Sequence, residues 1–191
     1  MHIVFGGSFN PPTKAHQEIV FKLIEVFPSS KVLILPVGSD YQRKELISFE
    51  HRYHMLNLMF KDVEQILILK DEDEHPYEGT LKALDRLSKR YDDIHFVIGS
   101  DNLKDLFTWI NYQKLLKKYP MIVMNRNHYT SKEEADALFQ SIEHHFTFID
   151  FSYDISSTQV RENIEKYKES LTQDVYTYIL KNQLYKEPNH V

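Results

Sequence analysis

The sequence predicts an α/β fold: a doubly wound, Rossmann-like parallel sheet of about six strands with a small C-terminal helical subregion. Short aliphatic and β-branched runs recur along the chain, with helical periodicity between them. A Gly-Gly turn follows the first run directly, at the kind of strand end where open α/β sheets bind ligands. The alternation stops after Ile149, so residues 1–150 are expected to form the core and 151–191 the helical part.

Strands are expected wherever such a run occurs. The runs are His2 to Phe5, Lys31 to Leu35, Gln65 to Leu69, Ile94 to Ile98, Met121 to Met124 and Phe146 to Ile149. Because no linker, repeat or low-complexity stretch divides the chain, residues 1–191 are expected to form a single domain.

Helices are expected where apolar residues share one face at helical spacing. Between the first two strands these are His16, Ile19, Val20, Leu23, Ile24 and Phe27. Later faces are marked by Met55, Leu56 and Met59, by Leu81, Leu84 and Leu87, and by Leu138, Phe139 and Ile142. Beyond the sheet, Asp154 to Arg161 opens a helical segment, and Thr172 to Gln183 forms a final helix with Thr172 as its N-cap.

Composition narrows the class of protein. The 191 residues include no cysteine, so thiolate chemistry is excluded, and the formal net charge of −5 argues against a general nucleic-acid binder. The chain has no apolar run long enough to span a bilayer, and its first residues lack the pattern of a secretory signal. A cytoplasmic location is therefore expected.

Two charged clusters invite a metal-site interpretation that we do not favour. Side chains of adjacent helical residues point about 100° apart, so the pair His144-His145 is better interpreted as a solvated helix surface. The acidic run Asp71 to Glu74 is expected to be a solvated loop.

The first strand end reads GGSFNPPTKAH, from Gly6 to His16. The glycines allow the backbone to approach a ligand closely, and His16 falls at the start of a helix whose N-terminus favours phosphate. The turn matches neither the G-x-G-x-x-G fingerprint nor a Walker A loop, and a purely structural turn could have the same composition.

A second candidate segment, ISSTQVR, runs from Ile155 to Arg161. An ordinary helix N-cap needs only one hydroxyl. Three hydroxyl residues followed by an arginine suit an anion with several oxygens, such as a triphosphate.

These two segments together resemble the end motifs of the nucleotidyltransferase superfamily that is characterised by H-x-G-H or T-x-G-H. Within it the chain is most similar to nicotinate- and nicotinamide-nucleotide adenylyltransferases. The similarity extends to YQRKELI with the following Glu50-His51-Arg52, to FVIGSD with Trp109, and to the C-terminal Val175, Tyr178-Ile179 and Leu184-Tyr185. The chain departs from the motif in two places: Thr13 stands at the first histidine and Ala15 at the usual glycine.

The resemblance implies transfer of AMP from ATP to the phosphate of a pyridine mononucleotide, and it implies the site residues. The implied catalytic residues are His16, Arg161 and Thr13. The implied ATP contacts are Gly7, Ser8, Phe9, Gly99, Asp101, Ser156, Ser157 and Thr158. The implied mononucleotide contacts are Lys44, Thr80 and Trp109. Mg²⁺ is expected on the ATP phosphates, without a carboxylate cluster of the protein.

Some of these residues also have structural interpretations. A lone lysine such as Lys44 is commonly a solvated charge, Arg52 can be a structural ion-pair residue, and a single tryptophan such as Trp109 commonly belongs to the core. The acceptor also has alternatives, namely nicotinamide mononucleotide and 4′-phosphopantetheine, and a non-catalytic nucleotide-binding regulator is a different class of function. Nicotinate mononucleotide is favoured because the pattern is that of compact bacterial-type enzymes. No nucleic-acid or membrane partner is expected, and a homo-oligomer stays open.

Overall fold

The computed structural model describes residues 1–41, 46–126, 130–151 and 157–186. Its centre is a parallel sheet of six strands in the order β3-β2-β1-β4-β5-β6. The strands are β1 (His2–Gly7), β2 (Lys31–Pro36), β3 (Ile66–Ile68), β4 (Ile94–Gly99), β5 (Met121–Arg126) and β6 (Phe146–Phe151). The order reverses between β1 and β4, which is the point where a doubly wound sheet binds its ligand. The predicted fold class is confirmed.

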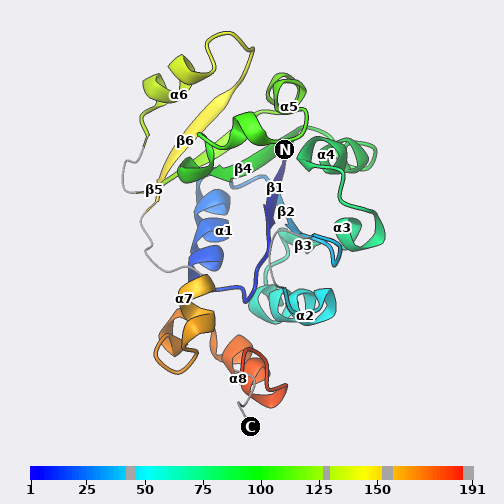
Figure 1. The fold of residues 1–191 in the computed structure, drawn as a ribbon, viewed down its shortest axis with the longest axis vertical. Helices are drawn as coiled ribbons and strands as arrows, with labels where there is room; N and C mark the ends of the chain where they lie inside the picture. Colours follow the sequence, from blue (N-terminus) through cyan, green and yellow to red (C-terminus); the bar gives the residue numbers. More distant parts are fainter. Residues whose placement is uncertain (42–45, 127–129, 152–156, 187–191) are drawn as a thin grey trace.

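Helices cover both faces of the sheet, with α1 on one side and α4 on the other (Figure 1). The helices are α1 (Lys14–Val26), α2 (Phe49–Phe60), α3 (Asp71–Glu74), α4 (Thr80–Leu87), α5 (Tyr112–Lys118), α6 (Lys132–Leu138), α7 (Ser157–Glu162) and α8 (Gln173–Lys181). Three short 3₁₀ turns span Ser100–Asn102, Leu106–Thr108 and Lys168–Ser170.

Alternate residues of the central strands enter two separate cores. Ile3 and Phe5 of β1 pack with α1, α2 and α8, whereas Val4 packs with α4 and α5. Because side chains alternate across a strand and both faces are covered, the central strands read as largely apolar runs, interrupted in β4 by His95. The sequence therefore indicated the strands by their hydrophobicity alone.

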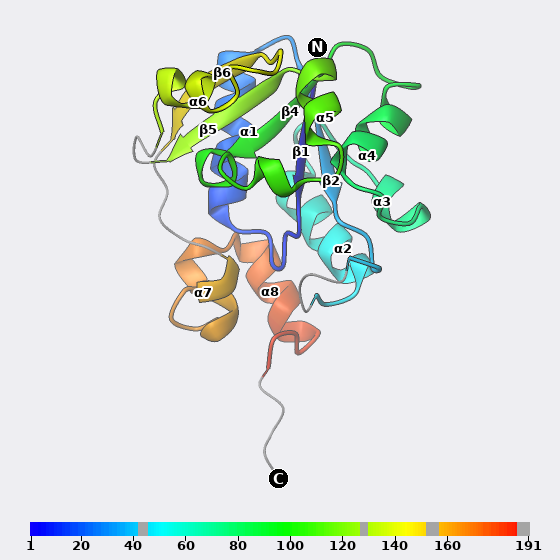
Figure 2. The ribbon, with the colours of Figure 1, turned by 45° about the horizontal axis from the view of Figure 1, so that its top comes forward.

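The C-terminal helices lie together beyond the carboxyl end of β1, and α8 packs against α2 (Figures 1 and 2). The Thr172 side chain accepts a hydrogen bond from the Val175 N–H at 3.4 Å, so the predicted N-cap of the final helix is confirmed. Within the described part of the chain, no helix is long and apolar enough to cross a membrane.

Several expected elements have different limits. Five strands run one or two residues further than expected at their carboxyl ends, whereas β3, an edge strand that pairs only with β2, is reduced to three residues. The helix expected around Leu138 to Ile142 ends at Leu138, and α5 was not expected. His144 and His145 lie after α6 in a loop, so their placement on a helix surface was wrong.

The acidic run was also misjudged. Asp71 and Glu72 begin the short helix α3 and are only 4 % exposed, because both carboxylates accept hydrogen bonds from Arg86 on α4. The first two residues of the expected solvated loop, Asp71 and Glu72, therefore belong to a largely buried ion-pair network.

Candidate active site

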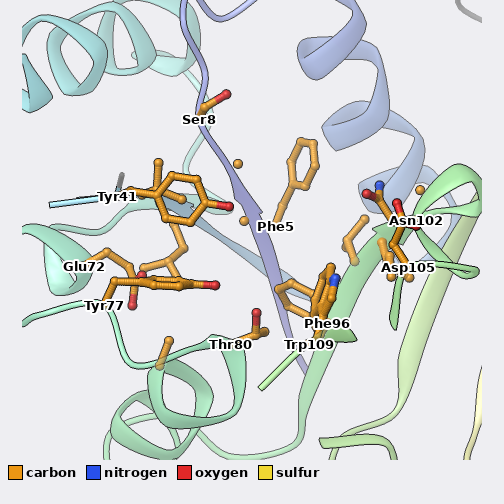
Figure 3. A pocket seen from close by; sticks show the side chains of 18 of the residues that line it. Phe5, Ser8, Tyr41, Glu72, Tyr77, Thr80, Phe96, Asn102, Asp105 and Trp109 are labelled. Atoms are coloured by element: carbon orange, nitrogen blue, oxygen red, sulfur yellow. The ribbon is translucent and has the colours of Figure 1, made fainter. Parts of the chain in front are cut away.

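A cavity of about 520 Å³ opens at the carboxyl ends of β1, β2 and β4 (Figure 3). The residues of its wall come from four segments that are distant in sequence. The lining includes Gly6, Gly7 and Ser8, then Val37 and Tyr41, then Glu72, Tyr77 and Thr80, then Gly99, Asn102 and Asp105, and finally Thr108, Trp109 and Ile110. The sheet topology thus places the predicted ligand site where strand order reverses.

The β1–α1 loop, residues 8–13, leads from the sheet to α1. A Cβ at Gly7 would lie 3.1 Å from the Phe9 ring, so the glycine allows this ring to pack closely beneath the turn. Phe9 itself has a φ of 46°, a strained value for a residue with a side chain, and its ring is held by edge contacts with Phe5 and His16. The loop conformation is therefore fixed by packing on the core.

His16 stands in the first turn of α1, and its orientation is set by the N-cap. Its Nδ1 accepts a hydrogen bond from the Thr13 backbone N–H at 3.0 Å and lies 2.9 Å from Thr13 Oγ1. Because Nδ1 accepts a backbone hydrogen, the proton of the neutral ring is assigned to Nε2. Thr13, which is fully buried, thus determines which nitrogen of His16 can donate to a ligand.

Arg52 on α2 is a fully buried cation that holds two loops, β1–α1 and β2–α2, by three carbonyl oxygens. Its guanidinium donates to Ile47 O at 3.2 Å, to Ser8 O at 3.0 Å and to Val37 O at 2.8 Å. Burial lowers the pKa of Arg52, while Tyr185 and Asp73 act in the opposite direction; an arginine remains charged in proteins nonetheless. A structural role for Arg52 fits these contacts, but its hydrogen-bond partners are backbone carbonyls and not the carboxylate expected for an ion pair.

Helix α7 holds the same β1–α1 loop from the other side. Ser157 Oγ donates to Pro11 O at 2.8 Å, and Arg161 Nη1 donates to Asn10 O at 2.6 Å. Arg161 Nη2 also donates to Thr158 Oγ1 at 3.2 Å. The two ends of the chain that carry the candidate motifs are therefore in direct contact.

The C-terminal segment contributes Tyr185, which sequence reasoning did not assign to the site. Its hydroxyl donates a hydrogen bond to Asn10 Oδ1 at 2.8 Å. The same Asn10 oxygen also accepts a hydrogen bond from the Ile47 N–H, at 3.5 Å. Burial raises the pKa of Tyr185 strongly, although Arg161 and Arg52 nearby oppose the shift, so the hydroxyl keeps its proton and acts as a donor.

The far wall of the cavity is built by the segment after β4. Gly99, Asn102, Asp105 and Trp109 line it, and the Trp109 ring packs edge-on against Phe96 with centroids 6.2 Å apart. Asp101 is exposed beside this wall, and its carboxylate accepts a hydrogen bond from Asn102 Nδ2 at 3.4 Å.

The structure thus gathers the sequence-predicted residues in two adjoining groups. Five of them line the cavity, namely Gly7, Ser8, Gly99, Thr80 and Trp109. Phe9, Thr13, His16, Ser157 and Arg161 belong to or contact the β1–α1 loop, and Thr158 is hydrogen-bonded to Arg161. Asp101 is in neither group, because it is exposed and does not line the cavity. Lys44 and Ser156 lie outside the described residues.

Several lining residues were missed by the sequence analysis, among them Tyr41, Glu72, Tyr77, Asn102 and Asp105. Only Asn102 and Asp105 could have been found from the sequence, because they follow closely after the strand end at Gly99. In the described part of the chain, no group of three or more His, Cys, Asp or Glu side chains is arranged to hold a metal ion.

Fold and site together define a nucleotide-binding α/β protein of the nucleotidyltransferase type. The chain belongs to the Cytidylyltransferase-like family, whose sequence profile matches residues 4–163. It is 41% identical over 188 residues to a protein of Acholeplasma laidlawii named "Probable nicotinate-nucleotide adenylyltransferase", and the match covers 98% of each chain. A protein of the same name from Clostridium acetobutylicum is 31% identical over 196 residues, with 95% of this chain and 97% of the relative covered.

The fold is shared with a solved structure. Nicotinic acid mononucleotide adenylyltransferase of Plasmodium falciparum, complexed with NaAD, superposes with a TM-score of 0.82 at 22% identity, covering 96% of both chains. At this identity the likeness supports the fold alone.

Proposed function

We propose that this chain is a nicotinate-nucleotide adenylyltransferase, which transfers AMP from ATP to nicotinate mononucleotide and releases pyrophosphate. The product is deamido-NAD, so the reaction belongs to NAD biosynthesis. The match to relatives of this name over nearly the full chain supports the assignment.

One structural observation carries the proposal. The β1–α1 loop leads into α1, and His16 lies in the first turn of this helix. The loop directly adjoins the cavity, which has the indole of Trp109 in its wall. An anion can be bound at the loop by helix N–H groups, while a flat heteroaromatic ring can be bound against Trp109. A nucleotide-type acceptor with a phosphate and an aromatic base needs both features side by side.

The reaction itself asks little covalent work of the protein. An oxygen of the acceptor's 5′-phosphate forms a bond to the α-phosphorus of ATP. The bond from that phosphorus to the bridging oxygen of the β-phosphate breaks, and its electron pair leaves with pyrophosphate. Since the attacking phosphate is already ionised at neutral pH, no strong base is required, and catalysis comes from positioning and charge stabilisation.

We assign the catalytic roles from the site geometry and the motif match. His16 donates from Nε2 to phosphate oxygens at the reacting centre, with Thr13 fixing the ring. Arg161, Ser157 and Thr158, with Ser156, bind the phosphates that leave as pyrophosphate.

The remaining roles concern the adenosine and the acceptor. Gly7, Ser8 and Phe9 lie along the adenylyl group, and Gly99 and Asp101 bind the adenosine ribose. Lys44, Thr80 and Trp109 bind the mononucleotide. Mg²⁺ bound to the phosphates of ATP would supply charge neutralisation there, and it would need no carboxylate cluster of the protein.

Steady-state kinetics with side-by-side acceptors tests the proposal. Pyrophosphate release from ATP is measured with nicotinate mononucleotide, nicotinamide mononucleotide and 4′-phosphopantetheine. The highest kcat/KM is expected with nicotinate mononucleotide. A preference for another acceptor would replace the substrate, and ATP binding without turnover on any acceptor would favour a regulatory protein.

A further inference from the structure

Two tyrosines form one side wall of the cavity. Tyr41 follows β2 and Tyr77 follows α3, and both line the cavity. Their rings meet edge to face with centroids 4.8 Å apart. Figure 3 shows both hydroxyl groups pointing into the cavity, towards Phe5 and Phe96, while Trp109 lies on the other side. Because the two loops are far apart in sequence, their pairing requires specific contacts.

Those contacts come from the three residues that precede Tyr41. Asp40 Oδ2 accepts a hydrogen bond from the Tyr77 backbone N–H at 2.8 Å, so this carboxylate connects the two tyrosine loops directly. Ser39 Oγ donates to Asp73 Oδ1 at 2.9 Å. At Gly38 a Cβ would lie only 1.9 Å from the carbonyl oxygen of Glu72, so only glycine allows the chain to pass α3 at this distance.

Helix α3 is in turn anchored to α4, which supports the cavity wall from behind. Arg86 Nε donates to Asp71 Oδ2 at 2.9 Å, and Arg86 Nη2 donates to Glu72 Oε1 at 2.8 Å. Arg90 Nη2 donates to the other oxygen of Asp71 at 3.1 Å. The two carboxylate side chains are 3% and 5% exposed, so these bonds are largely shielded from water and hold α3 rigidly.

We propose that Asp40 is a positioning residue for the acceptor. Asp40 holds Tyr41 and Tyr77 together as one wall, which the anchored helix α3 supports. The acceptor nucleotide is thereby confined between this wall and Trp109. The inference rests on the proposed function, because it assigns the Trp109 end of the cavity to the acceptor. The phosphates of ATP are assigned to the β1–α1 loop, which none of these contacts reaches. The sequence adds that Lys44, the expected phosphate ligand of the acceptor, follows Tyr41 after three residues.

Substitution of Asp40 tests the proposal, because its side chain is exposed and its loss removes no core packing. Asp40→Ala is expected to raise the KM for nicotinate mononucleotide about fivefold, while kcat and the KM for ATP change less than about twofold. Asp40→Asn keeps an oxygen that can accept the Tyr77 N–H and is expected to restore most of the affinity. Removing the Ser39 contact as well, in Ser39→Ala/Asp40→Ala, is expected to add a further loss in the same direction.

The matched control is Asp136→Ala on α6, which also removes a surface carboxylate that pairs with neighbours, Lys132 at 2.6 Å and His144 at 3.2 Å. It is expected to leave both KM values unchanged. Calorimetric binding of nicotinate mononucleotide to each variant gives a readout that does not need turnover. Unchanged acceptor binding in the double variant, or equal loss for ATP and acceptor, would overturn the positioning role. Absence of turnover by the wild-type enzyme would instead count against the proposed function.

Discussion

Arg52 gives the most direct test of how the site is held together. Three backbone carbonyls from two loops depend on one buried guanidinium, and no buried side-chain polar atom in the described residues lacks a partner. In Arg52→Met the side chain keeps its bulk but all three carbonyls lose their donor. A hydrogen bond to a charged group contributes about 1.5 kcal/mol or more, so the lost bonds sum to about 5 kcal/mol.

The net effect is smaller, because Arg52→Met also removes the cost of burying a charge. We expect a loss of about 3 kcal/mol in the free energy of unfolding, measured from urea denaturation curves. Arg52→Lys keeps the charge, but one ammonium group cannot reproduce the planar fork that reaches three carbonyls, so it should recover only part of the loss. Activity should fall in both variants, since Ser8 and Val37 line the cavity. A change below about 1 kcal/mol in Arg52→Met would refute this reasoning.

Three further predictions address the site itself. His16→Ala should lower kcat by roughly 10²-fold with little change in the unfolding midpoint; near-normal kcat would remove His16 from the reacting centre. Trp109→Ala should raise the KM for the mononucleotide by about tenfold and that for ATP much less, with Trp109→Phe intermediate, and nicotinate mononucleotide should quench Trp109 fluorescence; equal effects on both substrates would indicate a core role instead. Burial, aided by Asp71 and Asp40 and opposed by Arg86, raises the pKa of Glu72 from 4.5 to about 7. The folded state therefore binds this proton more tightly than the unfolded chain, so the contribution to stability is full below pH 4.5 and is lost as pH rises to about 7, by up to about 3 kcal/mol. Urea midpoints across this pH range should fall for the wild type relative to Glu72→Gln, and parallel curves for the two proteins would contradict the assigned shift.

The elements that the sequence predicts well are those whose signal is local. The central strands are largely apolar runs, and the cap at Thr172 is recognisable from its hydroxyl before a helical pattern. The helix near Leu138 was predicted too far along the chain, because the prediction used its apolar residues and not the signal for its N-terminus. Ser131 and Glu134 form a capping box that marks this start, and Phe139 lies beyond the last turn, stacked on Phe107.

Long-range pairings explain the remaining errors. Four acidic residues in a row look solvated because nothing local neutralises them, yet Asp71 is contacted by Arg86 from α4 and by Arg90 from the segment that follows α4. The tyrosine wall is equally invisible, because Tyr41 and Tyr77 meet only after β2 and α3 are placed side by side. Contacts of this kind depend on the packing of the whole α/β layer and not on any spacing in the sequence.

The contacts of the β1–α1 loop connect the motifs at opposite ends of the chain. A loop that binds phosphate must turn its carbonyl oxygens away from the anion, because they would repel it. Here the carbonyls of Ser8, Asn10 and Pro11 are each held by a side-chain donor, which belongs to Arg52, Arg161 and Ser157 respectively.

Arg161 therefore has two tasks in the proposed reaction. One N–H group fixes the Asn10 carbonyl, while a guanidinium carries five donors and leaves others for the departing pyrophosphate. The C-terminal motif is thus part of the loop's own hydrogen-bond network as well as a candidate phosphate site. A loss of activity on substituting Arg161 consequently combines two effects, and the Arg52 variants, which disturb the loop without removing a proposed phosphate ligand, provide the comparison that separates them.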